Sequence, residues 1–302
     1  MQSLFEDVLG KENVFLNEPM KNHTTFHIGG DADYFLEITD EAALLKVINI
    51  CREKNLPVFV LGNGSNLLVG DGGIRGVVLH FKKNFSSVRV SGNKIYAQSG
   101  ALLSKIAAEA ANNSLSGFEA VSGIPGTLGG AVYMNAGAYG FEVSGCIKKI
   151  KYLDEDLSIK EAEKEKCDFS YRHSMFTGTG KVILSAEFEF EYGEKEKIKE
   201  FMAEYTKKRV SKQPLEKFSA GSTFKRPEGY FAGALIEGAE LKGTKVGDAE
   251  VSEKHAGFVV NNKNASAKDV LELIRLVQKR VYEKYKVKLE PEVKLIGEFE
   301  DR

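Results

Sequence analysis

The chain has 302 residues, with 42 Lys or Arg against 43 Asp or Glu, so its formal net charge is −1 and no basic excess favours nucleic-acid binding. No apolar run approaches the roughly 18 residues that cross a bilayer, and the N-terminal MQSLFEDVLGKENVF is too charged for a signal peptide. Three widely spaced cysteines without a C-x-x-C pair are typical of reduced thiols. Membrane, secreted and disulfide-stapled classes are therefore disfavoured, and we expect a cytoplasmic protein.

Glycine is the unusual component of the sequence. There are 30 glycines, where average usage would give about 21. Six lie in residues 62–76 and eight in residues 117–145. Because glycine is needed where the backbone takes positive φ or approaches a ligand closely, two loops with a shared demand are predicted. Tight turns in a β-rich protein are the alternative.

The first glycine cluster follows a predicted helix and a predicted strand. Apolar residues recur at helical spacing over residues 44–51, and the apolar run at residues 57–61 predicts a buried strand. Residues 62–66, GNGSN, supply Gly and Asn, whose successive backbone N–H groups can bind phosphate. Leu67 stands where the dinucleotide pattern G-x-G-x-x-G needs its third glycine, which disfavours a Rossmann domain.

The second glycine cluster, residues 122–140, contains no charged side chain although 28% of the protein is charged. It follows a predicted helix at residues 102–111. Because a solvent-exposed loop is normally polar, this stretch predicts backbone packed against a large flat group. A tight internal packing loop is the alternative.

Strands and helices are also predicted in the C-terminal half. Residues 182–191 alternate like a strand, and the charged run at residues 194–218 predicts a solvated helix face. A strong helix is predicted to begin near Ser266 with Asp269 as its capping-box partner, and a strand at residues 293–296 follows it.

Six separated segments, in order over residues 22 to 297, resemble the family of bacterial UDP-N-acetylenolpyruvoylglucosamine reductases. They are TTFHIGG (24–30), LGNGSNLLV (61–69), SGIPGTLGGAVYMNAGAYG (122–140), YRHS (171–174), GSTFKRP (221–227) and LEPEV (289–293). The resemblance implies a cytoplasmic flavoenzyme of peptidoglycan precursor synthesis. Such an enzyme uses NADPH and non-covalent FAD to convert enolpyruvyl-UDP-GlcNAc to UDP-N-acetylmuramate.

The resemblance also implies an α+β fold. It consists of a two-subdomain FAD-binding region, of the type shared by p-cresol methylhydroxylase (PCMH) and vanillyl-alcohol oxidase, followed by a smaller α+β substrate-binding domain. The predicted segments are residues 1–83 and 84–195 for the FAD-binding subdomains and 196–288 for the substrate-binding domain. Residues 289–302 would form a C-terminal strand returning to the active site.

Catalysis is assigned by the resemblance to Arg172, Ser222 and Glu292. Hydride addition from flavin N5 to the terminal enolpyruvyl carbon builds negative charge on the adjacent carboxylate as an enediolate. Arg172 suits that charge, because a guanidinium stays protonated and binds carboxylates with two N–H groups. Ser222 would supply the proton. Glu292 would help to stabilise the enediolate, either as a neutral donor or as an ion that orients Arg172.

Without the family motif, the simpler interpretations are a surface arginine and a turn serine. The resemblance places FAD contacts in both glycine loops. These are Gly62, Asn63, Gly64, Ser65, Asn66, Ser122, Gly123, Ile124, Pro125, Gly126, Gly129, Gly130 and Ala131. The expected substrate contacts are Tyr171, Lys212, Arg226 and Asn135. No histidine or carboxylate pattern has metal-ligand spacing, so no metal is expected.

About 50 residues separate Arg172 from Ser222, so the chain resembles the shorter subtype, which lacks the insertion that carries a tyrosine lid. The expected partners are the UDP-sugar substrate and NADPH, with no nucleic acid and no membrane insertion. We expect a monomer or a weak dimer. The sequence does not decide between NADPH and NADH.

Two other functions remain open on the sequence. An oxidase of the same flavin superfamily would share the glycine loops but would not need the GSTFKRP and LEPEV segments. A non-catalytic nucleotide-sugar-binding module would lack flavin absorbance and keep its UDP-sugar affinity after the Ser222→Ala substitution.

Overall fold

The computed structural model describes residues 1–81 and 84–299, and the chain divides into two compact units. Residues 1–14, 36–63 and 78–209 make up the first unit, and residues 15–35, 64–77 and 210–302 make up the second. Each unit is assembled from separate stretches of chain, whereas the segments expected from the sequence are continuous and stay a prediction. The expected boundary after residue 83 falls at residues 82–83, outside the described residues.

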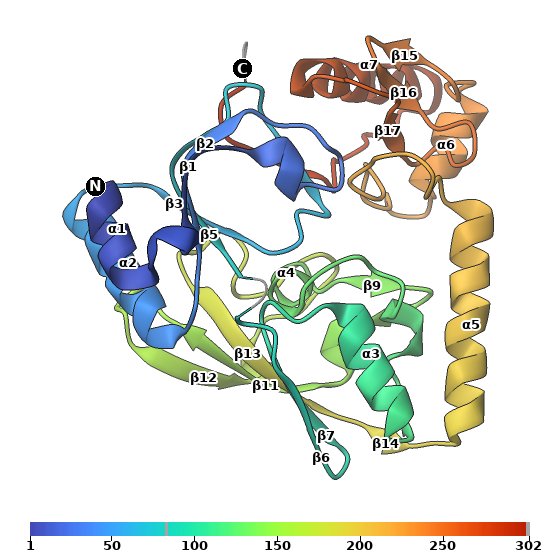
Figure 1. The fold of residues 1–302 in the computed structure, drawn as a ribbon. Coiled ribbons are helices and arrows are strands. Elements are labelled where there is room, and N and C mark those ends of the chain that lie inside the picture. The colour runs from blue at the N-terminus through green and yellow to red at the C-terminus, as the bar shows by residue number, and fades with distance from the viewer. Residues whose placement is uncertain (82–83, 300–302) are drawn as a thin grey trace. The chain divides into compact units, whose positions relative to one another are not determined.

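A five-stranded antiparallel sheet of order β12-β11-β13-β7-β6 forms the centre of the first unit (Figure 1). Its strands are β6 (Val88–Ser91), β7 (Lys94–Gln98), β11 (Ile147–Leu153), β12 (Ile159–Glu163) and β13 (Val182–Glu189). The helices α3 (Leu103–Asn112) and α4 (Leu128–Tyr133) contribute buried apolar residues to the core that the sheet also lines. The strand predicted at residues 182–191 is confirmed as β13 and the short β14 (Glu191–Tyr192).

The N-terminal elements of the first unit follow local sequence signals. They are α1 (Gln2–Leu9), α2 (Glu41–Glu53) and β3 (Val58–Leu61). The predicted helix is confirmed as α2. Asp40 caps its N-terminus by accepting a hydrogen bond from the Ala43 backbone N–H at 2.8 Å. The prediction of a buried strand holds for only one side of β3, because Val58 and Val60 are 40% and 39% exposed. Successive residues of a strand face opposite sides, and only the side of Leu61 is buried.

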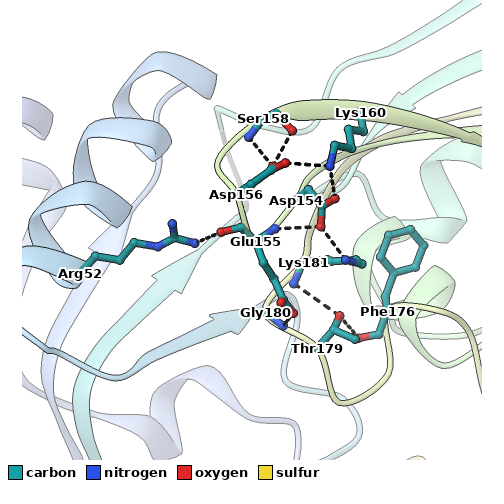
Figure 2. Close-up of polar contacts among 10 residues, drawn as sticks. All are labelled: Arg52, Asp154, Glu155, Asp156, Ser158, Lys160, Phe176, Thr179, Gly180 and Lys181. Carbon is teal, nitrogen blue, oxygen red and sulfur yellow. Dashed lines mark hydrogen bonds and ion pairs between the residues drawn. The ribbon is translucent and has the colours of Figure 1, made fainter.

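An ionic cluster joins the turn between β11 and β12 to the loop before β13 (Figure 2). Asp154 accepts hydrogen bonds from the ammonium groups of Lys160 and Lys181, both at 2.5 Å. The bond from Lys160, followed by that from Lys181, lowers the pKa of Asp154 to about 2. Arg52, near the end of α2, donates to the backbone carbonyl of Glu155.

The helix α5 (Lys195–Lys212) lies within the charged run predicted to be a solvated helix. Its exposure confirms that prediction: Ile198 is buried, whereas Phe201 is 50% exposed. The other short strands of the first unit are β8 (Leu115–Ser116), β9 (Gly137–Ala138) and β10 (Phe141–Glu142). Within the described residues, no helix combines the length and the apolar character needed to cross a membrane.

The second unit has its own apolar core, to which α6 (Ala232–Gly238) and α7 (Ala267–Tyr285) contribute. A three-stranded antiparallel sheet consists of β15 (Lys245–Val246), β16 (Ala249–Val251) and β17 (Val259–Asn261). The strand β18 (Lys294–Ile296) pairs in parallel with β4 (Leu67–Val69). The remaining strands are β1 (Val14–Pro19), β2 (Asp31–Glu37) and β5 (Ile74–His80), each of which contains residues of both units. Together with β3 they form a four-stranded sheet of order β1-β2-β5-β3.

The start of α7 confirms the predicted capping box. Ser266 Oγ accepts from the Asp269 backbone N–H, and Asp269 Oδ2 accepts from the Ser266 backbone N–H, both at 3.0 Å. The apolar face of the helix is buried in the core of the second unit. Local capping and apolar periodicity thus agree on where this helix begins and which face it buries.

Candidate active site

The start of the first glycine loop packs on the second glycine segment within the first unit. A Cβ added at Gly62 would lie 2.2 Å from Thr127 Oγ1, so only glycine permits this approach. Asn63 Nδ2 donates to the Pro125 backbone carbonyl at 2.7 Å. Residues far apart in the sequence, both expected to contact FAD, therefore form one surface made largely of backbone.

Part of the second glycine segment is helical, which corrects the prediction of a loop along its whole length. Residues 128–133 form α4, and Leu128, Ala131 and Val132 are buried in the core of the first unit. Packing of this helix against the sheet accounts for part of the segment's apolar character. The preceding residues, 122–127, remain as the connection that approaches Gly62.

The rest of the first glycine loop, residues 64–66, belongs to the second unit. Gly64 has φ +59°, and a Cβ there would lie 2.0 Å from the His23 backbone oxygen. This glycine is therefore required by the protein's own backbone. In the part of the chain that the structure describes, the backbone N–H groups of Ser65 and Asn66 donate to no protein acceptor. Such donors suit a pyrophosphate, so these residues fit an FAD site.

The segments that carry Ser222 and Glu292 lie side by side in the second unit. The Glu292 backbone N–H donates to the Thr223 carbonyl at 2.8 Å, and Phe224 and Pro291 form an antiparallel bridge. Ser222 is exposed, and the Glu292 side chain is half-buried. The structure thus brings together two of the three residues expected to be catalytic.

The first glycine loop adjoins the same pair of segments. Asn66 Nδ2 donates to the Glu292 carbonyl at 3.2 Å, and the Lys294 backbone N–H donates to the Asn66 carbonyl at 2.9 Å. Glu290 is directed elsewhere: its side chain is 70% exposed and pairs with Lys225 Nζ at 2.6 Å.

Arg172 lies in a tight turn of the first unit with a left-handed φ of +56°. Ser170 and His173 exchange backbone hydrogen bonds of 3.2 and 3.1 Å across this turn. The Arg172 guanidinium lies 4.8 Å from the Tyr171 ring centroid and donates to the Gly137 carbonyl at 3.4 Å. The turn therefore holds a cation beside the glycine-rich segment that continues from α4.

Asn135 has an internal role, which contradicts its expected contact with substrate. Its side chain is fully buried, and Nδ2 donates to Glu142 Oε2 at 2.8 Å and to the Ser170 carbonyl at 3.0 Å. Oδ1 accepts from the Ser144 backbone N–H at 3.3 Å. A buried amide with these partners supports the Arg172 turn and has no exposed surface for a ligand.

The other expected substrate contacts are accessible. Tyr171 is 47% exposed, and Lys212 is exposed at the last residue of α5. Arg226 is also exposed, and its guanidinium lies 4.0 Å from the Phe231 ring centroid. Stacking on this ring restricts the guanidinium, and Arg226 Nε also donates to the Tyr230 carbonyl at 3.4 Å.

Two contacts in the first unit were missed by reasoning from the sequence. Thr127 was not singled out, although a hydroxyl before a short apolar helix is a possible cap signal. Arg209 was grouped with the solvated charges of α5, but its side chain lies against Gly123, where an added Cβ would be 3.3 Å from Arg209 Cδ. Burial lowers the pKa of Arg209. Helical spacing alone does not reveal which charge on such a helix faces inward.

No group of three metal-ligating side chains occurs among the described residues. The three cysteines are free, and burial is the main cause that raises the pKa of each of their thiols.

Comparison with known proteins gives consistent matches over nearly the whole chain. Residues 213–296 match the model of the UDP-N-acetylenolpyruvoylglucosamine reductase C-terminal domain, and residues 32–160 match that of an FAD binding domain. The chain is 51% identical to the UDP-N-acetylenolpyruvoylglucosamine reductase of Clostridium novyi, over 97% of this chain and 95% of that protein. It is 52% identical to the Agathobacter rectalis reductase, over 94% of each. The crystal structure of the reductase (MurB) from Thermus caldophilus matches with a TM-score of 0.80 and 36% identity, covering 94% of this chain and 98% of that one.

Proposed function

This chain belongs to the UDP-N-acetylenolpyruvoylglucosamine reductase family, and on that basis we propose how its residues carry out the family's reaction. The enzyme is an FAD-containing oxidoreductase of peptidoglycan precursor synthesis, a UDP-N-acetylmuramate dehydrogenase that uses NADPH. Its substrate is enolpyruvyl-UDP-GlcNAc, and its product is UDP-N-acetylmuramate. Family membership favours this activity over an oxidase or a non-catalytic binding module.

The observation that best supports the residue assignments is the pairing of the Ser222 and Glu292 segments. The 2.8 Å bond from the Glu292 N–H to the Thr223 carbonyl aligns two segments that are widely separated in sequence. A hydroxyl and a carboxyl are thereby supplied on adjacent backbone. This is the combination that a reaction needs when it must both deliver a proton and stabilise an anionic intermediate.

The FAD site would draw on both glycine loops. The surface formed by Gly62, Asn63 and Pro125 has little side-chain bulk. The N–H groups of Ser65 and Asn66, which have no acceptor among the described residues, suit a pyrophosphate. Bound FAD, reduced by NADPH, would supply the hydride that adds to the enolpyruvyl carbon. The protein's part is to orient the substrate, to stabilise the charge that develops on it and to complete the addition with a proton.

Arg172 would bind the substrate carboxylate. The guanidinium keeps its charge throughout the reaction and offers parallel N–H donors, so it stabilises the enediolate more strongly than the ground-state carboxylate. Its turn is supported by the buried amide of Asn135 through the Ser170 carbonyl. A preorganised cation costs little reorganisation when the charge develops.

Ser222 would donate the proton to the carbon that bears the ether oxygen. The residue is exposed and follows Gly221, whose φ is +77°, while Thr223 is buried next to it. This places the hydroxyl on a short, well-anchored backbone segment. Glu292 would stabilise the enediolate together with Arg172.

Lys212, Arg226 and Tyr171 would bind the anionic and ring-containing parts of the UDP-sugar, since all three are exposed. We also propose that the chain is of the shorter subtype without the tyrosine lid, that it works in the cytoplasm and that it is a monomer or weak dimer.

Ser222→Ala tests the assignment of the proton donor. With FAD bound, NADPH should reduce the flavin at a near-normal rate, whereas reoxidation by enolpyruvyl-UDP-GlcNAc should slow by at least about 100-fold. Stopped-flow absorbance under anaerobic conditions separates these two half-reactions. Ser219→Ala, three residues upstream, is the matched control and should leave both rates unchanged. A loss confined to reduction by NADPH would show that Ser222 does not donate the proton.

A further inference from the structure

The backbone beside Ser222 is anchored to the turn between β16 and β17. The Thr223 backbone N–H donates to the Gly257 carbonyl, and the Val259 backbone N–H donates to Thr223 Oγ1, both at 2.8 Å. Thr223 and Val259 are 4% and 2% exposed. The position of Ser222 therefore depends on where this turn holds the Gly257 carbonyl.

His255 closes the same turn from within. Its Nδ1 accepts a hydrogen bond from the Gly257 backbone N–H at 3.1 Å. The ring lies edge-to-face with Phe258, at a centroid distance of 5.0 Å, and against Gly233 of α6. A Cβ at Gly233 or Gly257 would lie 3.3 or 3.0 Å from His255 Cε1, so both glycines make room for the ring. The imidazole thus occupies a fitted place in the fold.

The direction of this hydrogen bond fixes the protonation of the ring. A backbone N–H can only donate, so Nδ1 must carry no proton and the neutral ring holds its proton on Nε2. Burial lowers the pKa of His255, and the cations Lys242 and Lys212 act in the same direction. The backbone hydrogen bond and Glu237 oppose this effect. The surroundings therefore favour the neutral form that the turn requires.

We propose that neutral His255 is a positioning residue for Ser222, because it holds the N–H of Gly257, the residue whose carbonyl anchors Thr223. Protonation of Nδ1 would replace an acceptor with a donor facing the Gly257 N–H, and the turn would lose this support. The inference rests on the function proposed for Ser222. It adds a residue that contacts neither the reacting atoms nor the hydroxyl itself.

Two substitutions separate the acceptor from the ring. In His255→Asn, Oδ1 can take the place of Nδ1 as an acceptor that does not titrate. In His255→Phe, the ring shape is kept and the acceptor is lost. Because one hydrogen bond is removed, we expect His255→Phe to slow substrate-driven flavin reoxidation by about tenfold. Reduction of the flavin by NADPH should be unchanged.

His255→Asn should retain the reoxidation rate within about threefold and should remove the loss of rate at acid pH that we expect of the unsubstituted enzyme. Equal reoxidation rates in the two variants, or an equal loss in both half-reactions, would overturn the inference. So would an acid limb that persists in His255→Asn.

Hydrogen exchange provides a readout that does not depend on activity. In the FAD-bound enzyme, the Thr223 amide should exchange faster in His255→Phe than in His255→Asn, and faster at acid pH in the unsubstituted chain. Unchanged exchange would overturn the role of His255 even if the reductase activity is established. Conversely, altered exchange in an enzyme without substrate-dependent reoxidation would support the anchoring of Thr223 and refute the proposed function alone.

Discussion

Asn135→Ala should destabilise the first unit more than any change at an exposed asparagine. The substitution removes one hydrogen bond to the Glu142 carboxylate, one to the Ser170 carbonyl and a longer one from the Ser144 N–H. A bond to a charged group contributes about 1.5–3 kcal/mol, and a neutral bond contributes about 1 kcal/mol. The three together predict a loss of about 3–5 kcal/mol, because the side chain is fully buried and water cannot replace its partners.

Asn55→Ala is the matched control, because Asn55 has a similar left-handed φ of +52°, against +43° for Asn135, but is exposed. Both substitutions therefore share the cost of placing alanine in this conformation, about 1 kcal/mol. Urea unfolding, followed by far-UV circular dichroism with FAD at saturation, should separate the two variants by about 3 kcal/mol or more. A difference below about 1 kcal/mol would refute the view that this amide supports the turn that carries Arg172.

Three further outcomes follow from contacts elsewhere in the chain. Hydrogen bonds from Lys160 and Lys181 hold the pKa of Asp154 near 2, below its ordinary 3.8, so its stabilising effect should be present above about pH 4 and disappear as the pH falls toward 2. Asp154→Asn should flatten the change in urea midpoint over that range, and an unchanged profile would contradict this. Ser266→Ala should lower the free energy of unfolding by about 1 kcal/mol through loss of the α7 cap, whereas an equal melting temperature would count against it. Because burial raises the pKa of Cys146 to about 12, its alkylation by iodoacetamide at pH 8 should be far slower in the native protein than in urea, and equal rates would exclude this burial.

Local signals in the sequence were sufficient for several elements. Asp40 caps α2, and Ser266 with Asp269 forms the box that begins α7. Each of these contacts joins residues three positions apart, so its chemistry can be read from neighbouring letters. The apolar periodicity of both helices likewise predicts the faces that are buried. The family motifs point to Arg172, Ser222 and Glu292 by their residue types and order alone.

The support of the candidate site residues depends on contacts between segments that are distant in the sequence. The fold places the Glu292 backbone on the Thr223 carbonyl, buries the amide of Asn135 and seats His255 between two glycines. It also leaves one face of β3 open, although the sequence of that strand is apolar throughout. These features depend on which distant segments meet, and hydrophobic patterning constrains only which side of an element is covered. The residue types define the chemistry available to this protein, whereas the approach of distant backbone segments determines which groups are positioned to carry it out.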